Sequence, residues 1–394
     1  MLKNREEFGK YFIYLIFILW FGSEILINTT MTKVLFWDVD AFDEVMAIIV
    51  FVLLLIQIAF FQKYTKSEMI IIFLISVLVA FAVINASNNS LMSTWLFVIA
   101  SKYIDFDRIM LCAYIMLIVL SLAVIYLFFN GYINEVVVYR GQYLRHSWGF
   151  IHPNTLGVRV FQIVITHFYL RRNKLNVFDY SLIIIMVFFL YKIPNCQTAC
   201  LALLVFMILL IIKRFFEMFE NGITIFSKAV ILLAILANLL SVLISIIGVE
   251  HNRILMELDR FMSSRFSLCH KVYLHYGITF LGQNLNLNRI VMKHKIIKYY
   301  LDMAYMAMLL RYGVLVYFVF SALFIATMIV VYRNKQYMLI VILGTYAIYG
   351  IMENTFFSMT GNVFLLTMTL VVFKDITFNN EDTISNVRYR IAIK

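Results

Sequence analysis

The stretch RGQYLRHSWGFIHPNTLG, residues 140–157, is a polar segment that lies between two long apolar runs of the chain. It includes Pro153, one of only two prolines in 394 residues. Proline fits the first turn of a helix, where the N–H group that it lacks would have no partner. We therefore expect a helix to begin at Pro153, at a membrane surface, and most of the remaining chain to be the scaffold around this segment.

The composition is that of a membrane protein. Hydrophobic residues make up 63% of the chain and charged residues 14%, whereas a soluble globular domain is about half apolar and about a quarter charged. The net charge of +11 does not indicate a nucleic-acid partner, because no basic soluble domain exists to carry it. The four cysteines are too few and too scattered for a disulfide framework or a metal site. We predict neither a metal nor a cofactor.

Apolar runs long enough to cross a bilayer, roughly 20 residues each, recur along the chain. We predict an all-α polytopic membrane protein with about twelve transmembrane helices in a single integral-membrane domain, residues 1–394. Basic residues gather in alternate short loops, which places both termini in the cytoplasm and makes residues 375–394 a short cytoplasmic tail. The predicted spans are 11–28, 42–61, 69–87, 91–104, 109–129, 154–170, 178–194, 198–213, 225–248, 305–332, 337–356 and 361–373.

Two predicted outer segments depart from this charge pattern. One is residues 130–153, and the other is the large loop 250–301, in which eight basic residues face three acidic ones, a balance of +5. Long loops are exported despite their charge, so the topology still holds. A basic outer surface indicates an anionic ligand at the outer leaflet. The alternative is a solvated loop that lies near lipid headgroups.

The predicted helix start at Pro153 is a candidate phosphate site. The N–H groups at a helix N-terminus and its partial positive charge favour anions. Arg140 and Arg145 lie a few residues upstream of Asn154, so they could fold over this helix end. A simple helix start with interfacial arginines is the alternative.

Ionisable residues inside predicted spans are costly in lipid and indicate function. Arg159, Lys192, Arg311 and Glu353 all fall in the outer half of the membrane under the predicted topology, which indicates a polar cavity open to the outside. Arg159 follows His152 by seven residues, which puts both on one helix face. His167, near the inner end of its span, is better explained as a structural histidine.

Two further features connect the large loop with this cavity. Asp302, Tyr305, Leu309 and Tyr312 follow the spacing of one helix face. Asp302 could instead form a helix-stabilising pair with Lys298. Arg265 lies in an aromatic and amphipathic context, which favours a half-buried lid over a free loop.

The chain has no nucleotide-binding glycine loop, serine nucleophile elbow or H-E-x-x-H motif. A glycosyltransferase that uses nucleotide sugars would normally have a cytoplasmic soluble domain, and none is predicted here. We therefore expect a donor that already resides in the membrane, with its leaving group at the outer surface.

Taken together, four stretches resemble the Wzy-type polysaccharide repeat-unit polymerases of bacteria, which are related more distantly to O-antigen ligases. The resemblance covers most of the chain, and its most specific part is the pattern R-x-S-W-G-F-x-H-P-N-x-x-G. At the position where such proteins often have Ser-Arg-Thr, this chain has Cys196-Gln197-Thr198, so Lys192 or Arg159 could replace the missing arginine. The four stretches are RHSWGFIHPNTLG (145–157), ASKYIDFDR (100–108), SSRFSLCHKVYLHYGITFLG (263–282) and LDMAYMAMLLRYGVL (301–315).

The resemblance implies a multi-pass enzyme of the bacterial cytoplasmic membrane that makes capsule or exopolysaccharide. Such an enzyme transfers a growing glycan from undecaprenyl pyrophosphate to a lipid-linked repeat unit, without a metal, and works among other polysaccharide-assembly membrane proteins. Preorganised arginines would stabilise the leaving pyrophosphate. Glu353 is the favoured base, and His152 is the second candidate for the base or a substrate contact. Substrate contacts are predicted at Arg140, Arg145, Asn154, Arg159, Lys192, Arg265, Asp302, Tyr305 and Arg311.

Two alternatives remain open at this stage. A flippase or exporter of lipid-linked oligosaccharide would also need a cationic cavity, but it should carry cations to the midplane and often has repeated halves. A ligase that joins the glycan to another acceptor would use the same chemistry as the polymerase.

Overall fold

The computed structural model describes residues 2–33, 38–250, 252–287, 290–292, 295–297 and 300–373. The predicted cytoplasmic tail, residues 375–394, and three basic residues of the large loop, Arg289, Lys293 and Lys298, lie outside the described residues.

Local capping signals determine where several helices of the first half begin. Thr65 and Glu68 form a reciprocal capping box at the start of α3, and the side chain of Asp105 accepts a hydrogen bond from the N–H of Arg108 at the start of α5. The elements are α1 (Leu2–Ile27), η1 (Thr30–Lys33), α2 (Val39–Phe60), α3 (Lys66–Ala86), α4 (Ser90–Ala100), α5 (Phe106–Phe129) and the antiparallel hairpin β1 (Val138–Arg140)–β2 (Tyr143–Arg145).

The second half begins with the predicted helix at Pro153. Its elements are α6 (Pro153–Leu170), α7 (Val177–Lys192), α8 (Gln197–Phe216), α9 (Gly222–Ile247), α10 (Arg253–Phe261), α11 (Arg265–Tyr276), the hairpin β3 (Ile290–Met292)–β4 (Lys295–Ile297), α12 (Ala304–Ala307), the π-helix η3 (Met308–Tyr312), α13 (Gly313–Arg333), α14 (Tyr337–Tyr349), the 3₁₀-helices η4 (Asn354–Phe357) and η5 (Val363–Met368), and α15 (Thr369–Val372).

Seven helices among the described residues are long and apolar enough to cross a membrane, so the chain is an all-α, multi-pass membrane protein. Its peripheral helices expose large apolar side chains, such as Phe73 and Ile84 on α3 and Phe188 on α7, as a lipid-facing surface does. The predicted total of twelve spans stays a prediction. The last predicted span consists of 3₁₀ turns and the four-residue α15.

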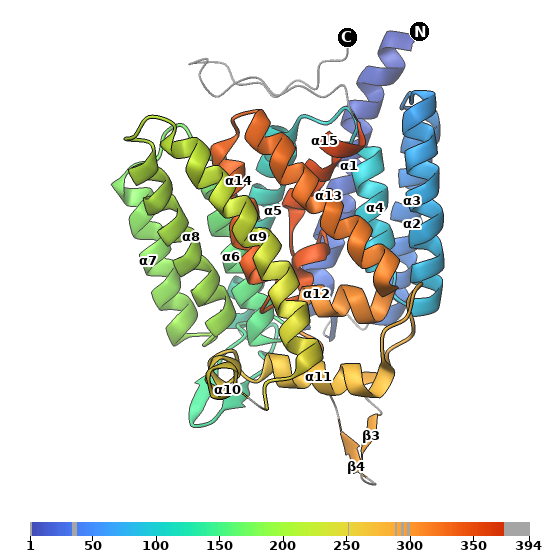
Figure 1. Ribbon diagram of the computed structural model, residues 1–394. Helices are drawn as coiled ribbons and strands as arrows, with labels where there is room; N and C mark the ends of the chain where they lie inside the picture. The colour runs from blue at the N-terminus through green and yellow to red at the C-terminus, as the bar shows by residue number, and fades with distance from the viewer. Residues whose placement is uncertain are drawn as a thin grey trace.

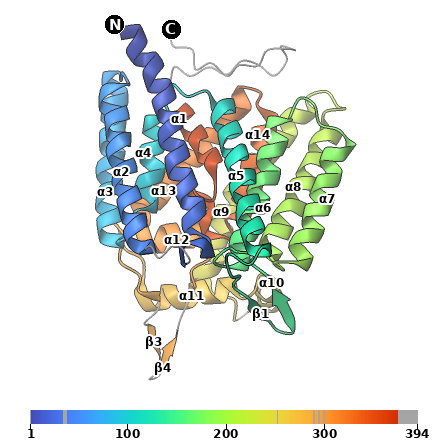
Figure 2. The ribbon, with the colours of Figure 1, turned by 180° about the vertical axis from the view of Figure 1, so that it is seen from behind.

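The outer segments of the prediction lie together at one end of the helix bundle. In Figure 1, α10, α11 and the β3–β4 hairpin lie at the end opposite to the beginning of α1. The view from behind shows the β1–β2 hairpin at the same end as α10 (Figure 2). Both segments that break the charge pattern therefore face the same side.

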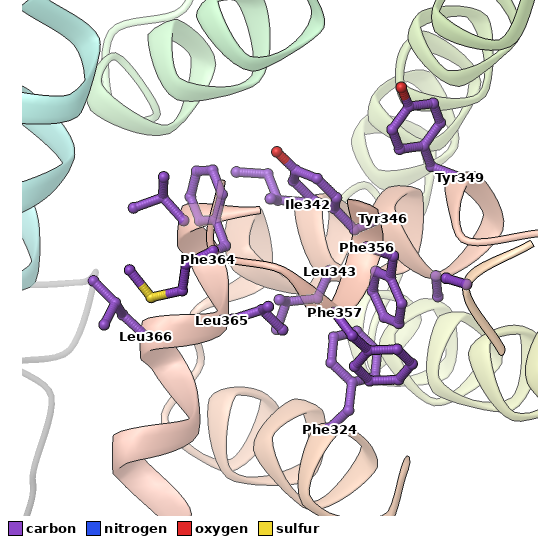
Figure 3. Close-up of a cluster of buried hydrophobic side chains, with 14 of the residues drawn as sticks. Phe324, Ile342, Leu343, Tyr346, Tyr349, Phe356, Phe357, Phe364, Leu365 and Leu366 are labelled. Atoms are coloured by element: carbon purple, nitrogen blue, oxygen red, sulfur yellow. The ribbon is translucent and has the colours of Figure 1, made fainter. Parts of the chain in front are cut away.

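The core of the bundle surrounds α14, whose side chains are buried almost throughout. Its Tyr349 ring packs on Phe161 of α6, with the ring centroids 4.7 Å apart. Phe356 and Phe357, 4.3 Å apart, pack with Phe324 of α13 in the cluster that Figure 3 shows. These aromatic contacts anchor the short chain segment that follows Glu353.

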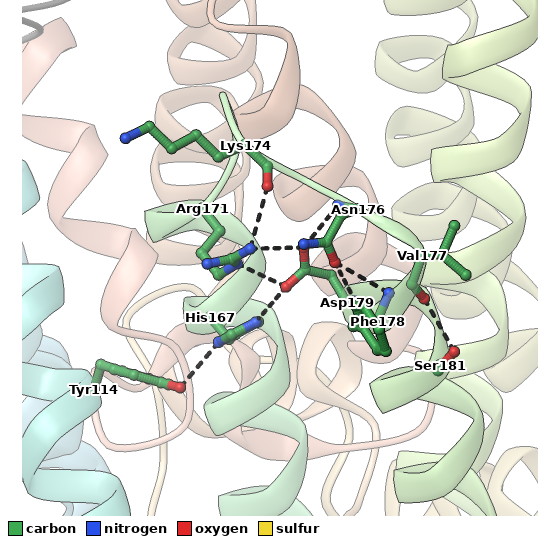
Figure 4. A network of polar contacts seen from close by, with 9 residues as sticks. All are labelled: Tyr114, His167, Arg171, Lys174, Asn176, Val177, Phe178, Asp179 and Ser181. Atoms are coloured by element: carbon green, nitrogen blue, oxygen red, sulfur yellow. Dashed lines mark hydrogen bonds and ion pairs between the residues drawn. The ribbon is translucent and has the colours of Figure 1, made fainter.

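A polar network joins the end of α6 to the start of α7 (Figure 4). His167 Nε2 lies 2.9 Å from a carboxylate oxygen of Asp179, and His167 Nδ1 lies 2.9 Å from the hydroxyl of Tyr114. Arg171 donates to both oxygens of the same carboxylate. His167 therefore has partners on both ring nitrogens, which confirms its structural role.

Candidate functional site

The candidate site begins at the N-terminus of α6. His152 is the residue before the helix, and its Nδ1 accepts a hydrogen bond from the backbone N–H of Asn154 at 3.0 Å. The imidazole thus occupies one of the N–H groups that were expected to favour an anion at this helix end. Since Nδ1 accepts, a neutral His152 carries its proton on Nε2 and can donate from that atom.

Arg145 folds over this helix end, as predicted. It is the last residue of β2, and its side chain donates through Nε to the carbonyl of Pro194 at 2.9 Å and through Nη2 to the side-chain oxygen of Asn154. Arg140, on the paired strand, donates to the carbonyl of Asn195 at 3.4 Å. The hairpin thus holds two guanidinium groups between the start of α6 and the turn that precedes α8.

Close packing brings the start of α8 against α6. A side chain at Gly157 would place its Cβ 2.5 Å from Cys196 Sγ and 2.8 Å from Cys196 Cβ, so only glycine permits this approach. Cys196 is the N-cap of α8, and Thr198 lies in the first turn. The contact therefore positions Thr198 beside the segment that carries Arg145.

Glu353 lies where α8, α11 and the segment before α12 meet. Thr198 Oγ1 donates to Glu353 Oε1 at 2.8 Å, and Arg265 Nη2 lies 3.7 Å from the same oxygen. Arg265 Nη2 also lies 3.7 Å from Asp302 Oδ2. The side chains of Arg265 and Glu353 are only 6% and 10% exposed, whereas that of Asp302 is 38% exposed, so one buried cation stands between a buried and a half-exposed carboxylate.

The fold of the large loop, residues 250–301, positions Arg265 at the start of α11. Asp259 of α10 accepts hydrogen bonds from the backbone N–H groups of Phe266 and Ser267, which closes the N-terminus of α11. Phe266 and Cys269 are buried against the bundle. Arg265 Nη1 is buried and has no hydrogen-bond partner among the described residues. This orphaned donor is an unusual and costly feature that a ligand oxygen would satisfy.

The electrostatic environment favours the neutral form of His152, which lies just before α6. Burial and then the positive charge of Arg145 lower its pKa, Asp302 acts in the opposite direction, and Arg140 lowers it further. The neutral imidazole with its proton on Nε2 is thus a hydrogen-bond donor and is poorly suited to act as a base there.

Three predicted contacts lie apart from this cluster. Arg159 is buried within α6 and donates to Gln162 and to the carbonyl oxygens of Thr360 and Glu24. Lys192 is exposed, with its Nζ 5.9 Å from the centre of the Phe188 ring. Tyr305 donates to the carbonyl of Ala347 at 2.7 Å. None of these contacts places Arg159 or Lys192 at Gln197, where one of them was expected to replace the missing arginine.

The predicted helix face from Asp302 to Tyr312 is wrong. Asp302 precedes the first turn of α12, and the π-helix η3 then changes the angular spacing of the following residues. Asp302 therefore joins the cluster from an irregular segment, while the Tyr305 side chain turns into the core. Arg311, within η3, lines a separate pocket near the same end.

Thr198 was not predicted as a site residue, although the sequence places it at a helix start. Its contact with Glu353 joins residues that are 155 positions apart, and no local sequence pattern predicts such a pair. Within the described part of the chain, no group of three or more His, Cys, Asp or Glu side chains could hold a metal ion. The side chains that the cluster offers to a ligand are two buried guanidinium groups, a neutral imidazole and a carboxylate.

No protein-family model, curated protein or solved structure matches the chain.

We expect the cap at His152 to make stability depend on pH. Because the folded-state pKa is lowered from 6.5, the unfolded chain binds the proton more readily, so this stabilisation is complete above the unfolded pKa and is lost as the pH falls through the folded pKa. Asparagine is also a good N-cap but does not titrate. Melting temperatures in detergent between about pH 7.5 and about pH 5 should fall more steeply for the wild type than for His152→Asn. Parallel curves would contradict the cap assignment.

Proposed function

We propose that the protein is a metal-independent glycosyltransferase that polymerises lipid-linked oligosaccharide repeat units at the outer face of the bacterial cytoplasmic membrane. The observation that carries this proposal is the buried Arg265, whose Nη1 has no partner in the part of the chain that the structure describes, while Nη2 lies between Glu353 and Asp302. A phosphate oxygen would satisfy this donor, and the adjacent carboxylate would serve the acceptor. The resemblance of the four sequence stretches to Wzy-type polymerases supports the same assignment.

The reaction is a substitution at the anomeric carbon of the donor sugar. The acceptor hydroxyl oxygen forms a bond to this carbon while the bond from the carbon to the pyrophosphate oxygen breaks. The bonding electrons leave with the oxygen, which yields undecaprenyl pyrophosphate, and Glu353 takes the proton of the acceptor hydroxyl. The donor is undecaprenyl-pyrophosphate-linked glycan, and the acceptor is a second lipid-linked unit.

Each residue of the cluster has a role that follows from its chemistry. Arg145 and Arg265 stabilise the negative charge that develops on the pyrophosphate in a dry environment, where such interactions are strong. His152 donates from Nε2, and Asn154 holds the guanidinium of Arg145. The hydrogen bond from Thr198 fixes the orientation of the Glu353 carboxylate. Asp302 keeps the guanidinium of Arg265 in place and is a positioning residue.

The test is reconstitution in proteoliposomes with lipid-linked repeat units extracted from the cells that produce the protein. The expected product is a ladder of chain lengths, which Arg145→Ala abolishes and the surface variant Arg253→Ala, on exposed α10, does not. Transfer of lipid-linked units across the bilayer without any polymer would instead assign a flippase. A single addition to a different acceptor would assign a ligase.

A further inference from the structure

A pocket of about 200 Å³ is lined in part by residues that follow Glu353 and Asp302 closely in the chain. It is formed by the beginning of α4, by α12 and η3, and by η4, whose first residues Asn354 and Thr355 follow Glu353 in the chain. Figure 1 shows α12 at the end of the bundle that holds α11. The chain therefore leads from Glu353 directly into the wall of this pocket.

An irregular helical turn, the π-helix η3, places Arg311 at the pocket. The π-helix η3 adds a residue to the helical turn, and such turns occur frequently at functional sites. The next residue, Gly313, has φ of +88°, and a Cβ there would lie 2.4 Å from the backbone nitrogen of Gly282. Gln283 donates to the carbonyl oxygens of Leu310 and Arg311 at 3.2 and 2.9 Å, so this turn is held from outside the helix.

The lining combines one cation with neutral hydrogen-bonding groups. Arg311 is partly exposed, and none of the residues that line the pocket is acidic. Within the described residues, no carboxylate forms an ion pair with Arg311. Tyr312 donates to the side-chain oxygen of Asn88, which leaves the Asn88 amide N–H groups available to a ligand. The remaining polar lining consists of Ser90, Asn354, Thr355 and Ser358.

We propose that this pocket binds a carboxylate-bearing sugar unit of the acceptor saccharide. This inference rests on the proposed function and specifies its substrate class. Hydroxyl and amide groups match sugar hydroxyls, and a planar guanidinium matches one carboxylate. The volume is below the roughly 300 Å³ of a drug-sized site, so it suits a single sugar ring. A pyrophosphate would require more than Arg311, the one cation among the described residues that line this pocket.

Saturation-transfer NMR on the full-length protein in nanodiscs tests the proposal without any need for catalysis. The probes are the methyl glycosides of glucuronic acid and glucose, which differ in the carboxylate. We expect the wild type to bind the glucuronide in preference to the glucoside. Arg311→Gln should lower the affinity for the glucuronide about tenfold and have little effect on the affinity for the glucoside. Arg253→Gln removes the same charge from the exposed surface of α10 and should change neither.

A second variant keeps the test decisive if Arg311→Gln does not fold. Asn88→Asp keeps the oxygen that accepts from Tyr312 and adds a negative charge to the pocket, so it should also weaken glucuronide binding. Equal binding of the two glycosides by the wild type, or an unchanged preference in both variants, would overturn the acidic-sugar site. Displacement of the glucuronide by inorganic phosphate at equal concentration would assign the pocket to phosphate and would also overturn it.

The outcomes separate this inference from the function on which it rests. A protein that shows the carboxylate preference but makes no polymer is not the proposed polymerase, although the acidic-sugar site stands. A protein that makes a ladder but shows no carboxylate preference keeps the proposed function and loses this substrate assignment.

Discussion

Arg265→Gln is expected to reduce polymer formation by about 100-fold to about 1000-fold, the range typical for removal of one preorganised charge-stabilising donor. The guanidinium is the buried cation between Glu353 and Asp302, and its Nη1 has no hydrogen-bond partner among the residues that the structure describes. The measurement is the initial rate of ladder formation in proteoliposomes. Arg253→Gln, the surface control on α10, should retain the wild-type rate.

The same substitution should also lower the melting temperature, because it leaves Glu353 buried without its cation. Breaking a buried ion pair costs about 3–5 kcal/mol, whereas removing both partners is often close to neutral. The double variant Arg265→Gln/Glu353→Gln should therefore recover much of the lost stability while it stays inactive. Recovery of polymer formation together with stability would show that Arg265 acts only in folding.

Glu353→Gln is expected to reduce the rate of polymer formation by about 10²-fold to about 10⁴-fold, the contribution of a positioned general base. The amide oxygen can still accept from Thr198, so the hydrogen bond of 2.8 Å has a counterpart in the variant. What is lost is the ability to take the proton of the acceptor hydroxyl. The measurement is again the initial rate, at a saturating concentration of lipid-linked units.

A binding measurement separates this role from substrate attachment. Removal of the carboxylate leaves Arg265 with one fewer negative neighbour, so undecaprenyl pyrophosphate should inhibit or bind the variant at least as tightly as the wild type. Glu353→Asp should keep some activity, because the carboxylate is retained but moved back by one carbon. A wild-type rate in Glu353→Gln would place the base elsewhere.

The helix start at Pro153 shows what local sequence can determine. Proline limits its own backbone and cannot donate, and His152 can cap the helix with its own side chain, so this boundary depends on neighbouring residues alone. The aromatic and amphipathic context of Arg265 likewise predicted a half-buried element, and the Arg265 side chain is buried. Glu353 was predicted because a charge inside an apolar segment indicates function, and Arg145 because it lies just before the helix start at Pro153.

Residue spacing did not predict the direction in which each side chain points. Tyr305 and Arg311 were placed by the regular period of an α-helix, but η3 departs from that period, so Tyr305 turns to Ala347 and Arg311 to a separate pocket. Lys192 is the last residue of α7 and is exposed, so the rotation of this helix about its axis decides what its side chain meets. Such rotations depend on neighbouring helices, which the period of one segment does not describe.

The sequence by itself determined that this is an apolar, multi-pass helical protein with a helix beginning at Pro153, because hydropathy and proline geometry act over a few residues. Only the tertiary structure decided that Thr198, Arg265, Asp302 and Glu353 meet. Their contacts join four segments far apart in the chain, and the packing of α6 on α8 and of α11 on the bundle sets the distances. The physical reason is that ion pairs and hydrogen bonds require a separation of a few ångströms in space, whereas spacing along the chain constrains that separation only within one element.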